Sequence, residues 1–173
     1  MSNQMIIKNG KLVDVYTGEI YKTDISINDG EITRVCENLS GKTTINAEGK
    51  YIVPGLIESH IHIESSMLSL TEFARAVIPC GTTTVVNDPH EIANVLGMDG
   101  IKFLIDESRN IPLNVYFTIP SCVPATPFET GGKTIGIPEV KELVNNNKII
   151  GLGEVMNFPG VISGDEEILN KIK

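Results

Sequence analysis

Residues 54–62 read Pro-Gly-Leu-Ile-Glu-Ser-His-Ile-His, and the pattern of the chain changes at this stretch. Before it, short aliphatic runs alternate with turn signals such as Asn9-Gly10 and Asp29-Gly30, which favour tight hairpins because these residues tolerate positive φ. After it, strand-like runs alternate with helix-like runs. We therefore expect a small antiparallel β-sandwich segment over residues 1–54 and an α/β unit over residues 55–173.

The α/β unit is expected to contain four strand-helix pairs. Alternating strands and helices imply a parallel sheet with helical crossovers. Four such pairs fit the first half of a TIM-type (β/α)8 barrel, which takes about 250 residues in full. The alternative is a complete doubly wound sheet of four strands. The strands are expected at residues 56–60, 82–87, 114–119 and 149–155, and the helices at 69–78, around 101–105, from 138 and from 163.

Net charge, the length of apolar runs and cysteine spacing indicate which partners and which compartment to expect. The formal net charge is −8, which argues against a nucleic-acid backbone or an anionic membrane surface as the main partner. No apolar run approaches the roughly 20 residues of a membrane-spanning helix. The 3 cysteines have no Cys-x-x-Cys spacing, which indicates reduced thiols rather than a disulfide framework. We therefore expect a cytoplasmic protein without a nucleic-acid or membrane partner.

The first chemical signal is the pair His60 and His62. Residues two apart on a strand share a face, so both imidazoles should emerge together from the end of a buried strand over residues 56–60. In a parallel barrel the carboxyl ends of the strands carry the catalytic groups. Two imidazoles on one face make half of a transition-metal site. The other interpretation is two polar residues leaving a strand, because His-x-His also arises by chance.

Two further strand ends carry residues that can bind metal. His90 follows the second strand within residues 88–91, Asp-Pro-His-Glu, and Glu154 closes the fourth. A carboxylate at the end of an apolar strand is costly to bury unless it meets a cation, although an ordinary surface glutamate is the simpler interpretation. We predict that His60, His62 and Glu154 converge on one metal-sized volume. His90 is then either a further metal or substrate contact or the cap of a helix starting near residue 91.

Taken together, these residues resemble the amidohydrolase superfamily. Residues 54–62 look like its first-strand motif, PGxxDxHxH, with a glutamate at position 58 in place of the common aspartate. Beyond this motif, four segments together resemble the adenine deaminase branch: HIHIESSML from His60, DPHEIANV from Asp88, PSCVPATPFET from Pro120 and GLGEVMNFPGV from Gly151. Chains of that branch continue well past residue 173.

The resemblance implies hydrolytic deamination of adenine to hypoxanthine and ammonia by a metal-activated hydroxide. His60 and His62 match the paired histidine ligands of the first metal. Glu154 matches the position where related enzymes often carry a carboxylated lysine that bridges two metals, so a catalytic and metal-binding role is implied for it. His90 is a candidate for a further ligand. The implied cofactor is a binuclear Mn(II) or Fe(II) centre, with Zn(II) as the other candidate.

Glu91 and Ser121 are our candidates for binding the purine. The remaining metal ligands and the general acid-base residue would lie beyond Lys173, so we expect residues 1–173 alone to be inactive and prone to associate. The full-length protein is expected to form a homo-oligomer. Two alternatives stay open: a related amidohydrolase acting on a cyclic amide or an N-acetyl sugar, and a metal-free assembly domain without catalysis.

Overall fold

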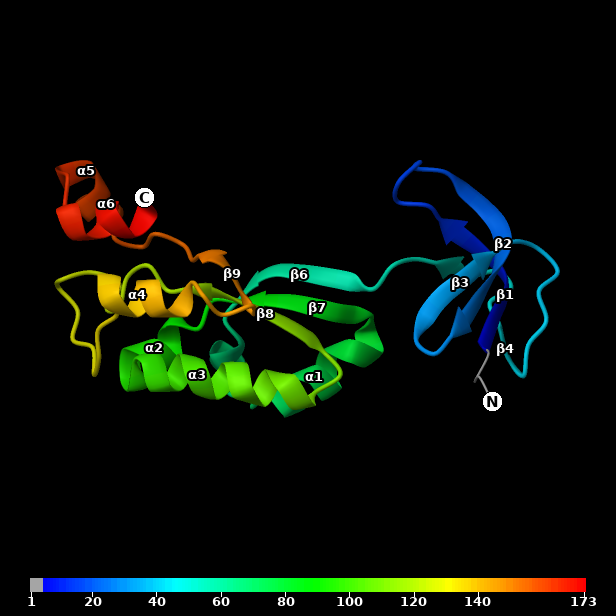
Figure 1. The fold of residues 1–173 in the computed structure, drawn as a ribbon, viewed down its shortest axis with the longest axis horizontal. Helices are drawn as coiled ribbons and strands as arrows, with labels where there is room; N and C mark the ends of the chain where they lie inside the picture. The colour runs from blue at the N-terminus through cyan, green and yellow to red at the C-terminus, as the bar shows by residue number, and fades with distance from the viewer. Residues whose placement is uncertain (1–4) are drawn as a thin grey trace. The chain divides into compact units, whose positions relative to one another are not determined.

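The computed structural model describes residues 5–173 and divides into two compact units, which meet in sequence between Pro54 and Gly55. The first unit contains the strands β1 to β5, and the second contains the remaining strands and all the helices of the described chain (Figure 1).

The first unit is one mixed sheet. Its strand order is β3-β2-β1-β4, with β5 also paired to β1. The β1–β2 and β2–β3 pairs are antiparallel, as expected, but β4 and β5 run parallel to β1. The expectation of a purely antiparallel unit is wrong here, because the segment after β3 crosses to the other edge of β1 instead of turning back in a hairpin. The strands are β1 (Met5–Val13), β2 (Ile20–Asn28), β3 (Glu31–Val35), β4 (Thr43–Asn46) and β5 (Tyr51–Ile52).

The two turn signals of this unit have different outcomes. Asp29 and Gly30 have φ of 51° and 86° and form the tight turn between β2 and β3. Asn9-Gly10 does not form a hairpin but lies inside β1, where Asn9 has φ of 62° and the register with β2 shifts. A residue that tolerates positive φ suits a bulge as well as a turn, so the dipeptide alone does not distinguish the two.

The second unit contains a parallel sheet of four strands in the order β6-β7-β8-β9. The strands are β6 (Leu56–Ile61), β7 (Thr82–Asn87), β8 (Asn114–Ile119) and β9 (Ile149–Leu152). Their order follows the chain without the reversal that a doubly wound sheet requires, which argues against that alternative. The strand β9 is shorter than expected, so Glu154 lies in the loop just after it.

Six α-helices connect or follow these strands: α1 (Leu70–Val77), α2 (His90–Leu96), α3 (Met98–Glu107), α4 (Ile137–Leu143), α5 (Phe158–Ser163) and α6 (Glu166–Ile172). The Ser69 hydroxyl caps α1 by accepting from Glu72 N. The expectation that Ser163 opens the last helix is wrong, because Ser163 ends α5 and Asp165 caps α6. None of the described helices combines the length and apolar character needed to cross a membrane.

The core of the second unit forms where α1, α2 and α3 lie along the sheet (Figure 1). It includes Val85, Phe117 and Ile101, each 0% exposed. The strand β6 was expected to be buried, but Leu56 and Ile57 are 56% and 68% exposed. Within residues 5–173, β6 pairs only with β7 and stands at the edge of the sheet, so one side of this strand is uncovered.

Candidate metal centre

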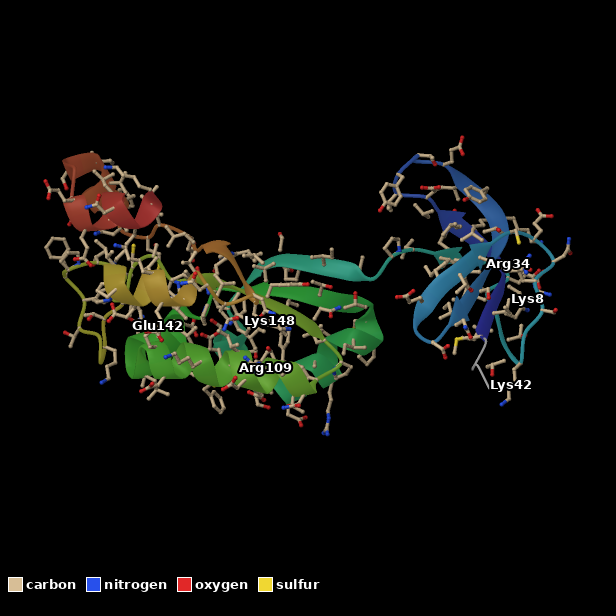
Figure 2. The ribbon with its side chains drawn as sticks, viewed as in Figure 1. Lys8, Arg34, Lys42, Arg109, Glu142 and Lys148 are labelled. Atoms are coloured by element: carbon tan, nitrogen blue, oxygen red, sulfur yellow. The ribbon has the colours of Figure 1, made fainter. Side chains whose placement is uncertain are left out.

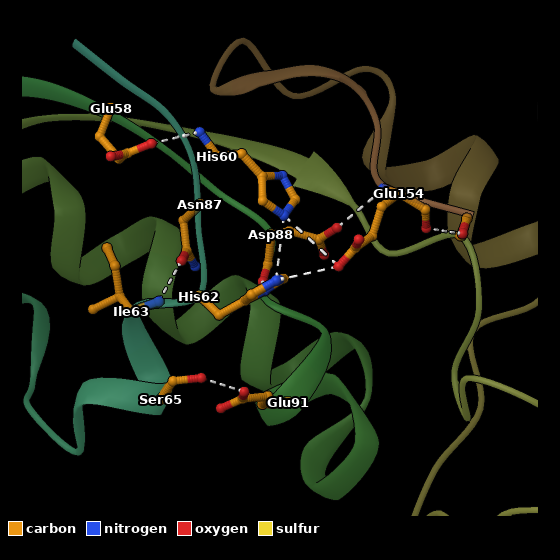
Figure 3. A network of polar contacts seen from close by, with 10 residues as sticks. Glu58, His60, His62, Ile63, Ser65, Asn87, Asp88, Glu91 and Glu154 are labelled. Carbon is orange, nitrogen blue, oxygen red and sulfur yellow. Dashed lines mark hydrogen bonds and ion pairs between the residues drawn. The ribbon is translucent and has the colours of Figure 1, made fainter. Parts of the chain in front are cut away.

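Three side chains meet at the carboxyl ends of β6 and β9 (Figure 3). His60 Nε2 and His62 Nε2 lie 3.3 Å apart. Glu154 Oε1 lies 3.2 Å from His62 Nε2 and 3.7 Å from His60 Nε2. Ligands that share one ion through bonds of about 2.0–2.2 Å lie roughly 3–4 Å from each other, so these separations fit a metal ion. The structure thus brings together the residues expected to converge, and their role as ligands stays a prediction.

The orientation of His62 suits a metal ligand. Its Nδ1 lies 2.8 Å from the carbonyl oxygen of Asp88, which can only accept a hydrogen bond. Nδ1 therefore carries the proton and donates, which leaves the Nε2 lone pair directed toward Glu154 and His60. Burial lowers the pKa of His62, but the Asp88 carbonyl and the carboxylates of Asp88, Glu154 and Glu91 together raise it above its ordinary value. The negative groups that favour a proton on this imidazole would equally attract a metal cation to Nε2.

Asp88 and His90 form a second group around His62. One donor atom of each of the three residues lies within 4.8 Å of the others, and the rings of His62 and His90 are 4.6 Å apart. Asp88 is 1% exposed, and burial raises its pKa. Two buried atoms of this group, Asp88 Oδ1 and His90 Nδ1, have no hydrogen-bond partner among the described residues. His62 is the residue that the two groups share.

His90 is the first residue of α2, and its Nδ1 has no hydrogen-bond partner among the described residues, so no hydrogen bond from that atom supports the helix-cap interpretation. Sequence reasoning also missed Asp88 as a candidate ligand. Its signal was available, since Asp88 follows β7 directly and therefore lies at the same end of the sheet as the histidines.

The two proposed substrate residues lie in different environments. Glu91 accepts a hydrogen bond from the Ser65 hydroxyl (Figure 3). Ser121 is 0% exposed, and its hydroxyl donates to the backbone carbonyl of Glu154 at 2.5 Å. Its burial and existing hydrogen bond argue against a direct contact between Ser121 and a substrate.

The loop after the fourth strand presents a carboxylate rather than a lysine to this centre. Lys148, labelled in Figure 2, precedes β9, whereas Glu154 follows it. Lys148 Nζ lies 5.8 Å from the centroid of the Tyr116 ring. A glutamate has two oxygens and can contact two cations without any covalent modification. Glu154 therefore meets the chemical requirement for a bridging ligand.

Comparison with known proteins assigns this chain to a family. Residues 51–173 match the family model described as the amidohydrolase family. The chain is 52% identical to an adenine deaminase of Clostridium acetobutylicum and 51% identical to one of Thermosipho africanus, with 98% of the chain covered in both cases. An adenine deaminase of Archaeoglobus fulgidus is 49% identical over 96% of the chain. The chain spans about 30% of the length of each of these relatives.

Solved structures share the fold at low sequence identity. An L-hydantoinase (dihydropyrimidinase) from Arthrobacter aurescens matches with a TM-score of 0.62 and 20% identity, over 88% of this chain and 32% of that one. A D-hydantoinase matches with a TM-score of 0.55 and 22% identity, over 81% of this chain and 30% of that one. These similarities support an amidohydrolase type of fold.

Proposed function

The chain belongs to the amidohydrolase family, and we propose that it forms part of an enzyme that hydrolyses adenine to hypoxanthine and ammonia. The observation that carries the proposal is the convergence of His60, His62 and Glu154 at the carboxyl edge of a parallel sheet. The near-complete coverage of this chain by adenine deaminases at about 50% identity supports the choice of substrate. Because the chain spans about 30% of those relatives, the activity is proposed for the whole protein.

The fold proposed for the whole protein is a (β/α)8 barrel, with residues 55–173 as its first half and residues 1–54 as part of a β-sandwich. Two features of the chain support it. The strands β6 to β9 follow one another in order, as in a barrel, and β6 leaves an exposed apolar edge that a later strand would cover. The hydantoinase structures, of which this chain covers about a third, support the same assignment.

The proposed cofactor is a divalent metal held by His60, His62 and Glu154, with His90 as an additional ligand of a binuclear centre. The fit rests on the orientation of His62 Nε2 and on the partnerless atoms of Asp88 and His90. Imidazole and carboxylate donors suit Mn(II), Fe(II) and Zn(II), and we propose Mn(II) or Fe(II). Bound there, the metal would supply hydroxide near neutral pH by lowering the pKa of water.

The residues of this chain contribute orientation and charge to that reaction. Asp88 fixes His62 through its backbone carbonyl, so that the imidazole presents Nε2 to the centre. The Glu154 carboxylate faces both histidines, so its negative charge would offset that of a metal held there. We keep Glu91 as the proposed purine contact, because a carboxylate can accept a hydrogen bond from the amine or a ring N–H of adenine.

We propose a cytoplasmic enzyme of purine salvage, and composition supports the choice of compartment. Cys36, Cys80 and Cys122 are all free thiols in the structure, which suits a reducing compartment. The formal charge of −8 suits a small neutral substrate better than a nucleic acid.

The experiment that tests this function uses the full-length protein loaded with Mn(II). Adenine, adenosine, cytosine and a cyclic imide are supplied separately, and ammonia release or ring opening is measured. We expect ammonia from adenine and much less from adenosine, because ribose needs additional room. A preference for the imide would assign the protein to the cyclic-amide hydrolases, and a preference for adenosine would contradict adenine as the proposed substrate.

A further inference from the structure

The backbone of Glu154 is held at both of its polar groups. Its N–H donates to Asp88 Oδ2 at 3.3 Å, and its carbonyl accepts from the Ser121 hydroxyl at 2.5 Å (the Asp88 contact is drawn in Figure 3). Asp88 follows β7 and Ser121 follows β8, so the ends of two neighbouring strands fix a residue that lies beyond the end of β9. A loop residue therefore gains the positional restraint that a strand would otherwise supply.

Both groups that hold Glu154 are buried. Asp88 is 1% exposed and Ser121 is 0% exposed, so packing fixes both partners even though Glu154 itself is exposed. Asp88 also accepts from His62 Nδ1 through its backbone carbonyl at 2.8 Å. One residue thus orients two of the three side chains that converge at the candidate metal centre.

Gly153 makes the contact with Asp88 possible by lacking a side chain. A Cβ at this position would collide with Asp88 Oδ2, and it would lie 3.1 Å from Thr118 Oγ1. Any larger residue at position 153 would therefore displace the Asp88 carboxylate from the Glu154 N–H.

Lys171 holds Ser121 from the side of α6. Its side chain is 7% exposed, and Nζ donates to the backbone carbonyls of Ser121 at 3.3 Å and Ile135 at 2.7 Å. Nζ also pairs with Glu167 at 3.1 Å, so the buried ammonium is neutralised. These contacts fix the loop that carries Ser121 and restrict the movement of its hydroxyl.

We propose that Ser121 is a positioning residue for Glu154, and that Asp88 and Ser121 together form a clamp on the Glu154 backbone that sets its carboxylate against His60 and His62. The inference rests on the proposed metal role of Glu154. It replaces the earlier expectation that Ser121 contacts the purine. Substitutions of groups that orient a metal ligand typically cost about 10-fold to 100-fold in metal affinity or activity, which sets the expected size of the effect.

The test compares Ser121→Ala with Ser108→Ala in the full-length protein. Ser108 is a matched control, because it is 3% exposed and its hydroxyl also donates to a backbone carbonyl, that of Ile105, at 2.6 Å. Mn(II) affinity is measured by competition with a chelator, thermal unfolding by calorimetry, and kcat and KM with adenine. We expect Ser121→Ala to lower metal affinity or kcat about tenfold or more with little change in KM, and Ser108→Ala to change neither.

Equal metal affinity and kcat in the two variants would overturn the clamp. A rise in KM for adenine with unchanged metal affinity would identify Ser121 as a substrate contact instead. Gly153→Ala provides a second test if Ser121→Ala does not fold, since it disturbs the clamp at Asp88 and should also weaken Mn(II) binding. If the unsubstituted enzyme binds Mn(II) but does not deaminate adenine, the proposed function fails while the metal-affinity comparison still decides the clamp.

Discussion

Each of the two units buries one aspartate, and the two carboxylates differ in how their oxygens are satisfied. In the first unit, Asp24 is 5% exposed and accepts from the N–H groups of Asn9 at 3.0 Å and Leu39 at 3.1 Å. The hydrogen bond from Asn9, followed by others from the backbone, lowers the pKa of Asp24 despite the opposing effect of burial. In the second unit, Asp88 accepts from Glu154 N through one oxygen, its other oxygen has no partner within residues 5–173, and burial raises its pKa.

The comparison separates a carboxylate whose hydrogen bonds are complete from one whose hydrogen bonds are not. Asp24 carries a charge that the backbone fully accommodates, so its role is to hold β1 and β2 and the loop before β4 in place. Asp88 is equally buried but incompletely satisfied, which is costly unless another group completes it. A buried acid with a raised pKa beside two histidines is typical of a functional site.

We expect the largest effect from Asp88→Asn, which should lower the deamination activity. The amide keeps an acceptor for Glu154 N but removes the charge beside His62 and His90, so deamination by the full-length enzyme should fall about 10-fold to 100-fold. The metal-free variant should unfold at an unchanged or higher temperature, because the raised pKa means that the ionised carboxylate destabilises the fold at neutral pH. Full activity in this variant would remove Asp88 from the site.

Asp24→Asn should show the opposite pattern. The asparagine loses charge-assisted hydrogen bonds from Asn9 and Leu39, so the free energy of unfolding should fall by about 1 to 3 kcal/mol. Activity per folded molecule should not change, since Asp24 belongs to the other unit. Denaturant unfolding and kcat of the same preparation provide both measurements, and a loss of kcat without a loss of stability would contradict the structural assignment.

The convergence of residues at the candidate metal centre could be predicted because it depends on local patterns. The two-residue spacing of His60 and His62 sets a common face, and the strand-helix alternation sets which ends of the strands meet. The hydrogen bonds of Ser121 and Asp88 could not be predicted, because they depend on the path of the loops after β7, β8 and β9. For the same reason, the crossing that makes β4 parallel to β1 leaves no signal in residue spacing.

A smaller effect is expected in the pH dependence of stability. Because the pKa of Asp24 is lowered from 3.8 in the folded state, its contribution to stability is present above that value and is lost as the pH falls through the folded-state pKa. The difference in unfolding free energy between the unsubstituted protein and Asp24→Asn should therefore be constant near neutral pH and shrink below about pH 4. A difference that stays constant into strong acid would show that Asp24 is not ionised in the fold.

The smallest effect is expected for an exposed ion pair. Lys102 Nζ and Glu142 Oε1 lie 2.7 Å apart between α3 and α4, with side chains 52% and 61% exposed. The pair raises the pKa of Lys102, but solvent and salt screen such contacts. Lys102→Met should leave both activity and thermal unfolding unchanged within error, and a clear destabilisation would show that short distance matters more than burial in this protein.

The central claim is that His60, His62 and Glu154 bind one metal ion. It is tested most directly by an anomalous difference map, collected at the manganese absorption edge, from crystals of the full-length protein grown with Mn(II). We predict a peak within bonding distance of both Nε2 atoms and of a carboxylate oxygen of Glu154. A manganese peak elsewhere in the protein, with Glu154 turned away from the two histidines, would contradict the account.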